Sequence, residues 1–129
     1  YEHSEVCVKM KRIIQSYKKT DKSNERFDEE DWKQLIAETD IRWNDITIRL
    51  AAKYPLSQDE IYLCCLHLTD IPTSHFRYLM ECSRDAINAL INRLHFVIFW
   101  IHLSLNNEPS RLNMIASTTF LHFLYTFIG

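Results

Sequence analysis

The stretch LSQDEIYLCCLHLTDIPTSHFRYLMECSRDAINALINRL, residues 56–94, decides the fold of this chain. It opens with a capping-box pattern, because Ser57 can accept a hydrogen bond from the amide of Glu60 and the Glu60 side chain can reach back to the amide of Ser57. The apolar residues that follow are too dense for a helix that exposes one face to water. We therefore expect a buried first helix over residues 56–68.

Two further helices are predicted in the same stretch. A break at residues 69–72 precedes Thr73 and Ser74, either of which can cap a short second helix, and Ser83 can cap a third. Apolar residues recur at helical spacing along both helices. Three capped helices joined by two tight turns predict a trihelical helix-turn-helix unit over residues 56–94.

The composition agrees with an all-helical chain. Of the 129 residues, 47% are hydrophobic, which is enough to bury a single core. The one glycine, Gly129, leaves no flexible backbone for phosphate-binding loops, dinucleotide-binding turns or nucleophile elbows. We therefore predict the all-α class and exclude the enzyme classes that depend on glycine.

The N-terminal segment, residues 1–26, predicts an amphipathic helix followed by a linker. Its apolar residues step by four, three and four positions, as along the seam of a coiled coil, and lysine and arginine surround them. Two heptads leave two interpretations open: a helix that lies on its own domain, or the end of a longer dimerising helix. The residues of this candidate dimerisation seam are Val6, Met10, Ile13 and Tyr17.

Two more helices are predicted between this segment and the quoted stretch. Asp28 is suited to cap a helix over residues 29–38, while Phe27 packs onto Trp32. A second amphipathic helix is expected over residues 43–53, and a proline soon after it ends the helical pattern.

We expect a helical domain over residues 27–95 and an apolar C-terminal extension over residues 96–129. Residues 95–105 are almost wholly apolar, and periodicity alone does not separate a helix from a strand there. After a turn at residues 106–110, residues 112–129 carry no Lys, Arg, Asp or Glu. A buried or partner-covered helix is favoured over a membrane span, because aromatic belts and charged flanks are missing.

Cysteine and histidine spacing predicts neither a metal site nor a catalytic site. A group of Cys64 or Cys65 with His67, His75 and Cys82 can be drawn, but no CxxC or HxxxH pair anchors it. The histidines also lack a serine or cysteine nucleophile at a known spacing. We expect reduced core thiols, no metal, no cofactor, no small-molecule substrate and no catalytic residues.

Three runs of residues resemble a known family: FDEEDWKQL (27–35), RWNDITIRLAAKYPLSQDEIYLCCLHL (42–68) and IPTSHFRYLMECSRDAINALINRL (71–94). They are similar to the C-terminal cytoplasmic region of Bacteroidetes transcriptional regulators, whose longer forms carry tetratricopeptide repeats, a membrane helix and a coiled coil. The final domain of that family is a LuxR-like helix-turn-helix. The resemblance implies a cytoplasmic DNA-binding transcription regulator.

The chain begins at Tyr1 rather than Met, from which we expect a fragment of a longer product. The resemblance implies an upstream membrane-anchored sensor region in the same protein. By position, it also implies that Ser83 caps the recognition helix and that Ile87 and Leu94 anchor this helix to the core. The residues placed at or beside DNA are Thr73, Ser74, Arg77, Arg84, Asn88, Asn92 and Arg93.

The charge of this region predicts weak DNA binding by a single chain. Neutralisation of phosphates by Lys and Arg normally supplies much of the affinity for DNA. A homodimer would strengthen binding by placing two weak units on one site. Residues 56–95 hold more acidic than basic side chains: Arg77, Arg84 and Arg93 against Asp59, Glu60, Asp70, Glu81 and Asp85.

An alternative function stays open. A degenerate helix-turn-helix can serve as a protein–protein interaction module, because a fold does not fix a function. The aromatic residues that would contribute to such a surface are Trp43, Phe96, Phe99 and Trp100.

Overall fold

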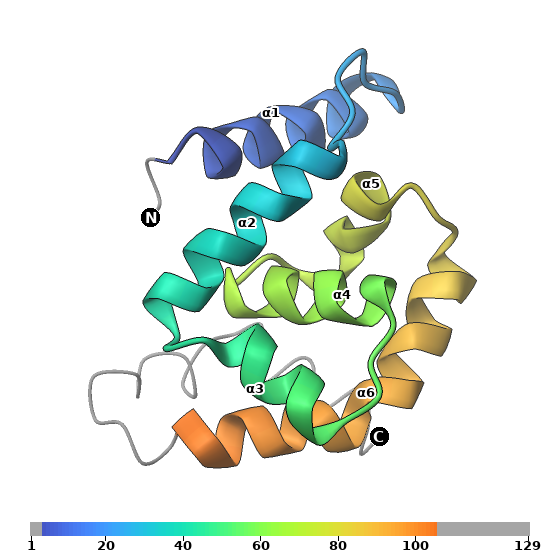
Figure 1. Ribbon diagram of the computed structural model, residues 1–129. Coiled ribbons are helices and arrows are strands. Elements are labelled where there is room, and N and C mark those ends of the chain that lie inside the picture. The colour runs from blue at the N-terminus through green and yellow to red at the C-terminus, as the bar shows by residue number, and fades with distance from the viewer. Residues whose placement is uncertain (1–3, 106–129) are drawn as a thin grey trace.

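In the computed structural model, every regular element of the described residues is a helix (Figure 1). The structure describes residues 4–105, without the side chains of residues 96, 100 and 102–105. The all-α prediction is confirmed for this range. The elements are α1 (Glu5–Thr20), α2 (Glu29–Arg42), α3 (Ile46–Lys53), α4 (Gln58–Leu68), the short 3-10 helix η1 (Thr73–His75), α5 (Phe76–Met80) and α6 (Arg84–Leu105).

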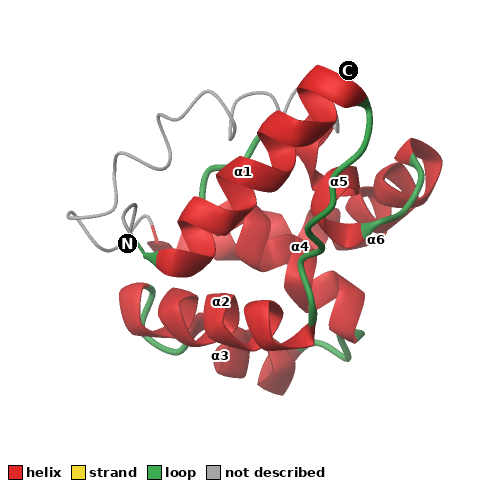
Figure 2. Cartoon of the chain, turned by 90° about the horizontal axis from the view of Figure 1, so that it is seen from above, coloured by secondary structure: helices red, strands yellow, loops and turns green. Residues whose placement is uncertain are grey.

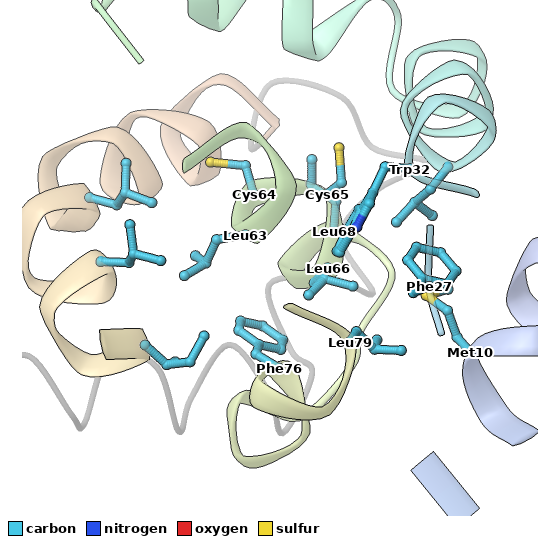
Figure 3. Packing of buried hydrophobic residues seen from close by; sticks show 14 of the residues in the cluster. Met10, Phe27, Trp32, Leu63, Cys64, Cys65, Leu66, Leu68, Phe76 and Leu79 are labelled. Atoms are coloured by element: carbon cyan, nitrogen blue, oxygen red, sulfur yellow. The ribbon is translucent and has the colours of Figure 1, made fainter. Parts of the chain in front are cut away.

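Helix α4 lies at the centre of the bundle. It packs against α2, α5 and α6, and the consecutive residues Leu63, Cys64, Cys65 and Leu66 are completely buried. A helix buries neighbouring positions on all of its sides only when other elements surround it. Figure 3 shows these side chains in the core together with Phe76 of α5. The dense apolar run therefore predicted the burial of α4 correctly.

The predicted capping box of α4 is present. Ser57 Oγ accepts a hydrogen bond from the Glu60 amide at 3.2 Å, and Glu60 Oε1 accepts one from the Ser57 amide at 2.9 Å. After α4 ends at Leu68, Asp70 adopts a left-handed backbone conformation with φ of 61°. Aspartate tolerates this conformation because its short side chain can hydrogen-bond locally, so the turn forms without glycine.

The start of the second predicted helix differs from the prediction. No side-chain hydrogen bond caps η1 or α5. Instead, the backbone N–H of His75 donates to the carbonyl of Pro72 at 2.9 Å. The prediction that Thr73 or Ser74 caps this helix is therefore wrong, because a 3-10 turn satisfies the backbone in its place.

Ser83 caps α6, as its position predicted. Its Oγ accepts a hydrogen bond from the Ala86 amide at 3.1 Å. Helix α6 then continues to Leu105, so residues 95–105, for which the sequence left helix and strand open, are helical. The boundary predicted after residue 95 falls within this helix.

Replacing Ser83 with alanine is expected to lower the free energy of unfolding by about 0.5–2 kcal/mol, because the Ala86 amide loses its partner at the start of α6. Ser74→Ala is the matched control. Ser74 caps no helix, so its replacement should change the free energy by less than about 0.5 kcal/mol. Chemical denaturation followed by circular dichroism measures both values, and equal effects would contradict the role given to Ser83.

Helix α1 packs on its own domain. Val6, Met10 and Ile13 are at most 2% exposed, and Tyr17 stacks on Tyr78 of α5 with 4.8 Å between ring centroids. Figure 2 shows α5 beside the C-terminal half of α1. The dimerisation seam predicted from these α1 residues is corrected accordingly: the same chain already covers them, so they offer no seam to a second chain.

The N-terminus of α2 agrees with the prediction. Asp28 caps the helix, and Asp31 completes a reciprocal capping box with 3.0 Å between donor and acceptor in both directions. Phe27 meets Trp32 edge to face with 4.6 Å between ring centroids. Trp32 in turn stacks on Tyr62 of α4 at 4.1 Å, which joins the start of α2 to the central helix.

The junction between α2 and α3 lies farther along the chain than predicted. Helix α2 is longer than the helix predicted over residues 29–38, and α3 begins at Ile46, which makes it shorter than the helix predicted over residues 43–53. Asn44 and Asp45 have positive φ angles of 55° and 57°. Such backbone cannot continue a right-handed helix, so these two residues set the boundary.

The C-terminal extension is described only in part. The turn expected at residues 106–110 and the uncharged segment at residues 112–129 lie outside the described residues. Within residues 4–105, none of the helices combines the length and the apolar character needed to cross a membrane.

Candidate functional site

A shallow depression between α5 and α6 brings together most of the residues predicted to contact DNA. Its volume is about 170 Å³. The side chains come from η1, α5 and α6 and include five of the seven residues inferred from sequence; Asn92 and Arg93, farther along α6, do not line the depression. The lining residues are Thr73, Ser74, Arg77, Arg84, Ile87 and Asn88.

Over its first turns, helix α6 has one buried face and one exposed face. Arg84, Asn88 and Asn92 are exposed and follow one another at intervals of about one turn. Arg93 is also exposed, but at about 100° per residue it lies roughly 180° around the helix from Arg84. The two arginines therefore flank the exposed face on opposite sides. The buried face consists of Ile87, Leu90, Ile91 and Leu94.

Arg77 is held in place by aromatic contacts. Its guanidinium carbon lies 4.9 Å from the centroid of the Tyr78 ring, and its Nη2 donates a hydrogen bond to the Tyr78 hydroxyl at 3.2 Å. The Nε atom of Arg77 is buried without a hydrogen-bond partner, which costs free energy. Stacking on Tyr17 fixes Tyr78 in turn, so the position of Arg77 depends on α1.

This contribution of α1 was missed from the sequence. The contact between Tyr17 and Tyr78 joins residues that are far apart in the chain, so no local sequence pattern predicts it. The seam pattern did mark Tyr17 as an apolar position of α1, but it did not identify α5 as the partner.

The negative charge of the acidic side chains around the turn between α5 and α6 is partly neutralised. Both carboxylate oxygens of Glu81 accept hydrogen bonds from the Arg26 guanidinium, at 2.7 and 2.8 Å. These hydrogen bonds, more than any other influence, lower the pKa of Glu81. Asp85, by contrast, is exposed in the first turn of α6, where its charge faces the solvent close to the depression.

The cysteines show no feature of a reactive or metal-binding group in the described part of the chain. All four are free thiols, and Cys64 and Cys65 are completely buried. Burial raises the pKa of Cys65 to about 12 and also raises the pKa of Cys64, so both remain protonated thiols at neutral pH. Within residues 4–105, no group of three or more His, Cys, Asp or Glu side chains is placed to hold a metal ion.

Over residues 4–105, every regular element is a helix, and a polar, partly basic depression lies between the neighbouring helices α5 and α6. Comparison with protein families, with curated proteins and with solved structures found no match. The resemblance to LuxR-like regulators therefore remains a hypothesis.

Proposed function

We propose that this chain is a DNA-binding transcription regulator that acts in the cytoplasm. In this proposal, α4, α5 and α6 form a helix-turn-helix unit, and α6 is the recognition helix that enters the major groove. The observation that supports it best is the depression that is lined by residues of η1, α5 and the first turns of α6. A titration with duplex DNA at low salt tests the proposal.

The exposed residues of α6 suit the two kinds of contact that DNA recognition needs. Asn88 and Asn92 can bind adenine edges with two hydrogen bonds each. Arg84 and Arg93, on opposite flanks of the exposed face, are placed to reach guanine edges or the phosphates on the two sides of a groove. Thr73 and Ser74, in η1 just before α5, are suited to phosphate contacts.

The balance of charge favours weak binding by one chain. Few cations lie on the proposed surface, and phosphate neutralisation dominates affinity. A homodimer would compensate through avidity, but it would need a surface other than the α1 residues that the same chain buries. In a longer protein, contacts between upstream regions of two chains would also bring two of these domains together.

Replacing Asp85 with asparagine is expected to tighten duplex binding by about twofold to fivefold. The substitution removes a negative charge that faces phosphate, and such a charge is worth about 1 kcal/mol or less in water. Glu29→Gln, at an exposed first-turn position of α2, is the matched control and should leave affinity unchanged. Affinity that is unchanged or weaker in the Asp85 variant would show that the exposed face of α6 does not meet phosphate.

A second candidate function is protein–protein interaction through α6. Phe99 supports this alternative, because it is 58% exposed and aromatic residues are enriched in protein–protein interfaces. Trp43, however, is only 5% exposed and belongs to the core. The two candidates differ in their dependence on Arg84 and Arg93, since only DNA binding requires both arginines.

A further inference from the structure

Arg77 differs from Arg84, the other arginine of the depression, in how its side chain is held. Both line the depression, but Arg84 is exposed whereas Arg77 is only partly exposed. Neither takes part in an ion pair within residues 4–105. A guanidinium group has five N–H donors, and Arg77 donates from Nη2 to the Tyr78 hydroxyl. Its charge and its other donors are therefore available to a phosphate that enters the depression.

The Arg77 guanidinium depends on Tyr78 for its position. Two effects disfavour that position: Nε is buried without a hydrogen-bond partner, and fixing a long side chain costs conformational entropy. The contacts with Tyr78 oppose both effects, because the ring attracts the cation from 4.9 Å and the hydroxyl accepts a hydrogen bond at 3.2 Å. A displaced Tyr78 would therefore release Arg77.

Helix α1 holds the Tyr78 ring in turn. The rings of Tyr17 and Tyr78 are nearly parallel, with an interplanar angle of 12° and 4.8 Å between centroids, where α1 packs on α5 (Figure 2). The ring of His75 in η1 lies farther from Tyr78, at 6.0 Å. Helix α1 contributes no side chain to the depression, yet Tyr17 links it to Arg77 there.

We propose that Tyr17 is a positioning residue for DNA binding: through Tyr78 it keeps Arg77 in place to bind a backbone phosphate. This inference rests on the proposed function, because it requires duplex DNA to lie over the depression. It gives α1 a regulatory role, since lifting α1 from α5 would lower the affinity for DNA. The strength of one aromatic pair limits this effect to about twofold to tenfold.

A double-mutant cycle tests the coupling between Tyr17 and Arg77. Fluorescence anisotropy at low salt measures duplex DNA binding by the intact chain, Tyr17→Ala, Arg77→Ala and the double variant. Arg77→Ala is expected to weaken binding by about threefold to tenfold, and Tyr17→Ala by about twofold to fivefold. The double variant should bind no more weakly than Arg77→Ala, because Tyr17 acts only through Arg77. Additive losses would overturn the inference.

Two hydroxyl deletions form a matched pair. Tyr17→Phe keeps the stacked ring and should preserve the affinity of the intact chain. Tyr78→Phe removes the hydrogen bond to Arg77 and should weaken binding by about twofold. Equal affinities of these two variants, or the opposite order, would contradict the role given to Tyr17. This comparison decides alone if Tyr17→Ala does not fold.

Ile14→Val controls for a general loss of stability. Ile14 is 6% exposed on the same helix, so the loss of one buried methyl group should lower the denaturation midpoint while the aromatic contact remains. We expect the affinity of this variant for DNA to stay at the wild-type value. A loss of affinity equal to that of Tyr17→Ala would show that Tyr17 acts through stability alone.

The outcomes separate this inference from the proposed function. If Tyr17→Ala keeps the wild-type affinity while Arg84→Ala weakens binding, the role of Tyr17 is rejected and the proposed function stands. If the intact chain does not bind duplex DNA at low salt, both are rejected.

Discussion

Phe76→Ala is expected to lower the free energy of unfolding by about 3–5 kcal/mol. Phe76 is completely buried and lies on α5, which packs against α1, α4 and α6. Truncation would remove the apolar contacts of the ring and leave a cavity where these helices meet. Because a small domain is stable by only about 5–15 kcal/mol, this one change would remove a large part of its stability.

Phe99→Ala is the matched control for this prediction. The same atoms are removed from α6, but the Phe99 ring is 58% exposed, so the free energy of unfolding should change by about 0.5 kcal/mol or less. Urea denaturation followed by circular dichroism gives both values. A loss at Phe76 no larger than the loss at Phe99 would contradict the packing described for α5.

The elements that could be predicted are those whose signals are local. The capping box of Ser57 and Glu60 and the dense apolar run after it specify α4 within a few residues. The cap at Ser83 marks the start of α6 in the same way. Such signals depend on neighbours in the chain, so one sequence is enough to read them.

The features that could not be predicted depend on contacts between distant residues or on residues that suit two conformations. The spacing of Val6, Met10 and Ile13 fits a dimer seam and a helix packed on its own domain equally well, and only the tertiary structure distinguishes them. Asn44 and Asp45 are acceptable at the start of a helix and in left-handed turns, which explains the misplaced junction between α2 and α3.

The candidate site was predictable to the extent that it lies on α6. Helical periodicity places Asn88 and Asn92 away from the apolar residues and Arg84 at the edge of the exposed face, and all three side chains are exposed in the structure. The surroundings of Arg77 were not predictable, because Tyr17 reaches Tyr78 only after α1 packs on α5.

Replacing Arg84 and Arg93 together with alanine is expected to weaken duplex DNA binding by at least tenfold. Each arginine contact to a base edge or phosphate is worth about 1–3 kcal/mol, and about 1.4 kcal/mol corresponds to tenfold in affinity. Both arginines are exposed, so their removal should leave the free energy of unfolding within about 0.5 kcal/mol of the wild-type value.

The matched control removes two positive charges elsewhere. Arg12→Ala with Lys33→Ala lowers the net charge by the same amount, and these side chains pair with Glu25 and Glu30 on other surfaces. We expect this variant to bind DNA within about twofold of the wild-type affinity, because its lost charges lie away from the proposed groove contacts. Equal weakening in both double variants would indicate only a general effect of net charge.

The central claim, that the exposed face of α6 binds duplex DNA, is tested most directly by fluorescence anisotropy. Labelled genomic duplex fragments would be titrated at low salt with the intact chain and with the Arg84→Ala, Arg93→Ala variant. We expect saturable binding by the intact chain and at least tenfold weaker binding by the folded variant. No binding at low salt, or the same affinity for both chains, would contradict the claim.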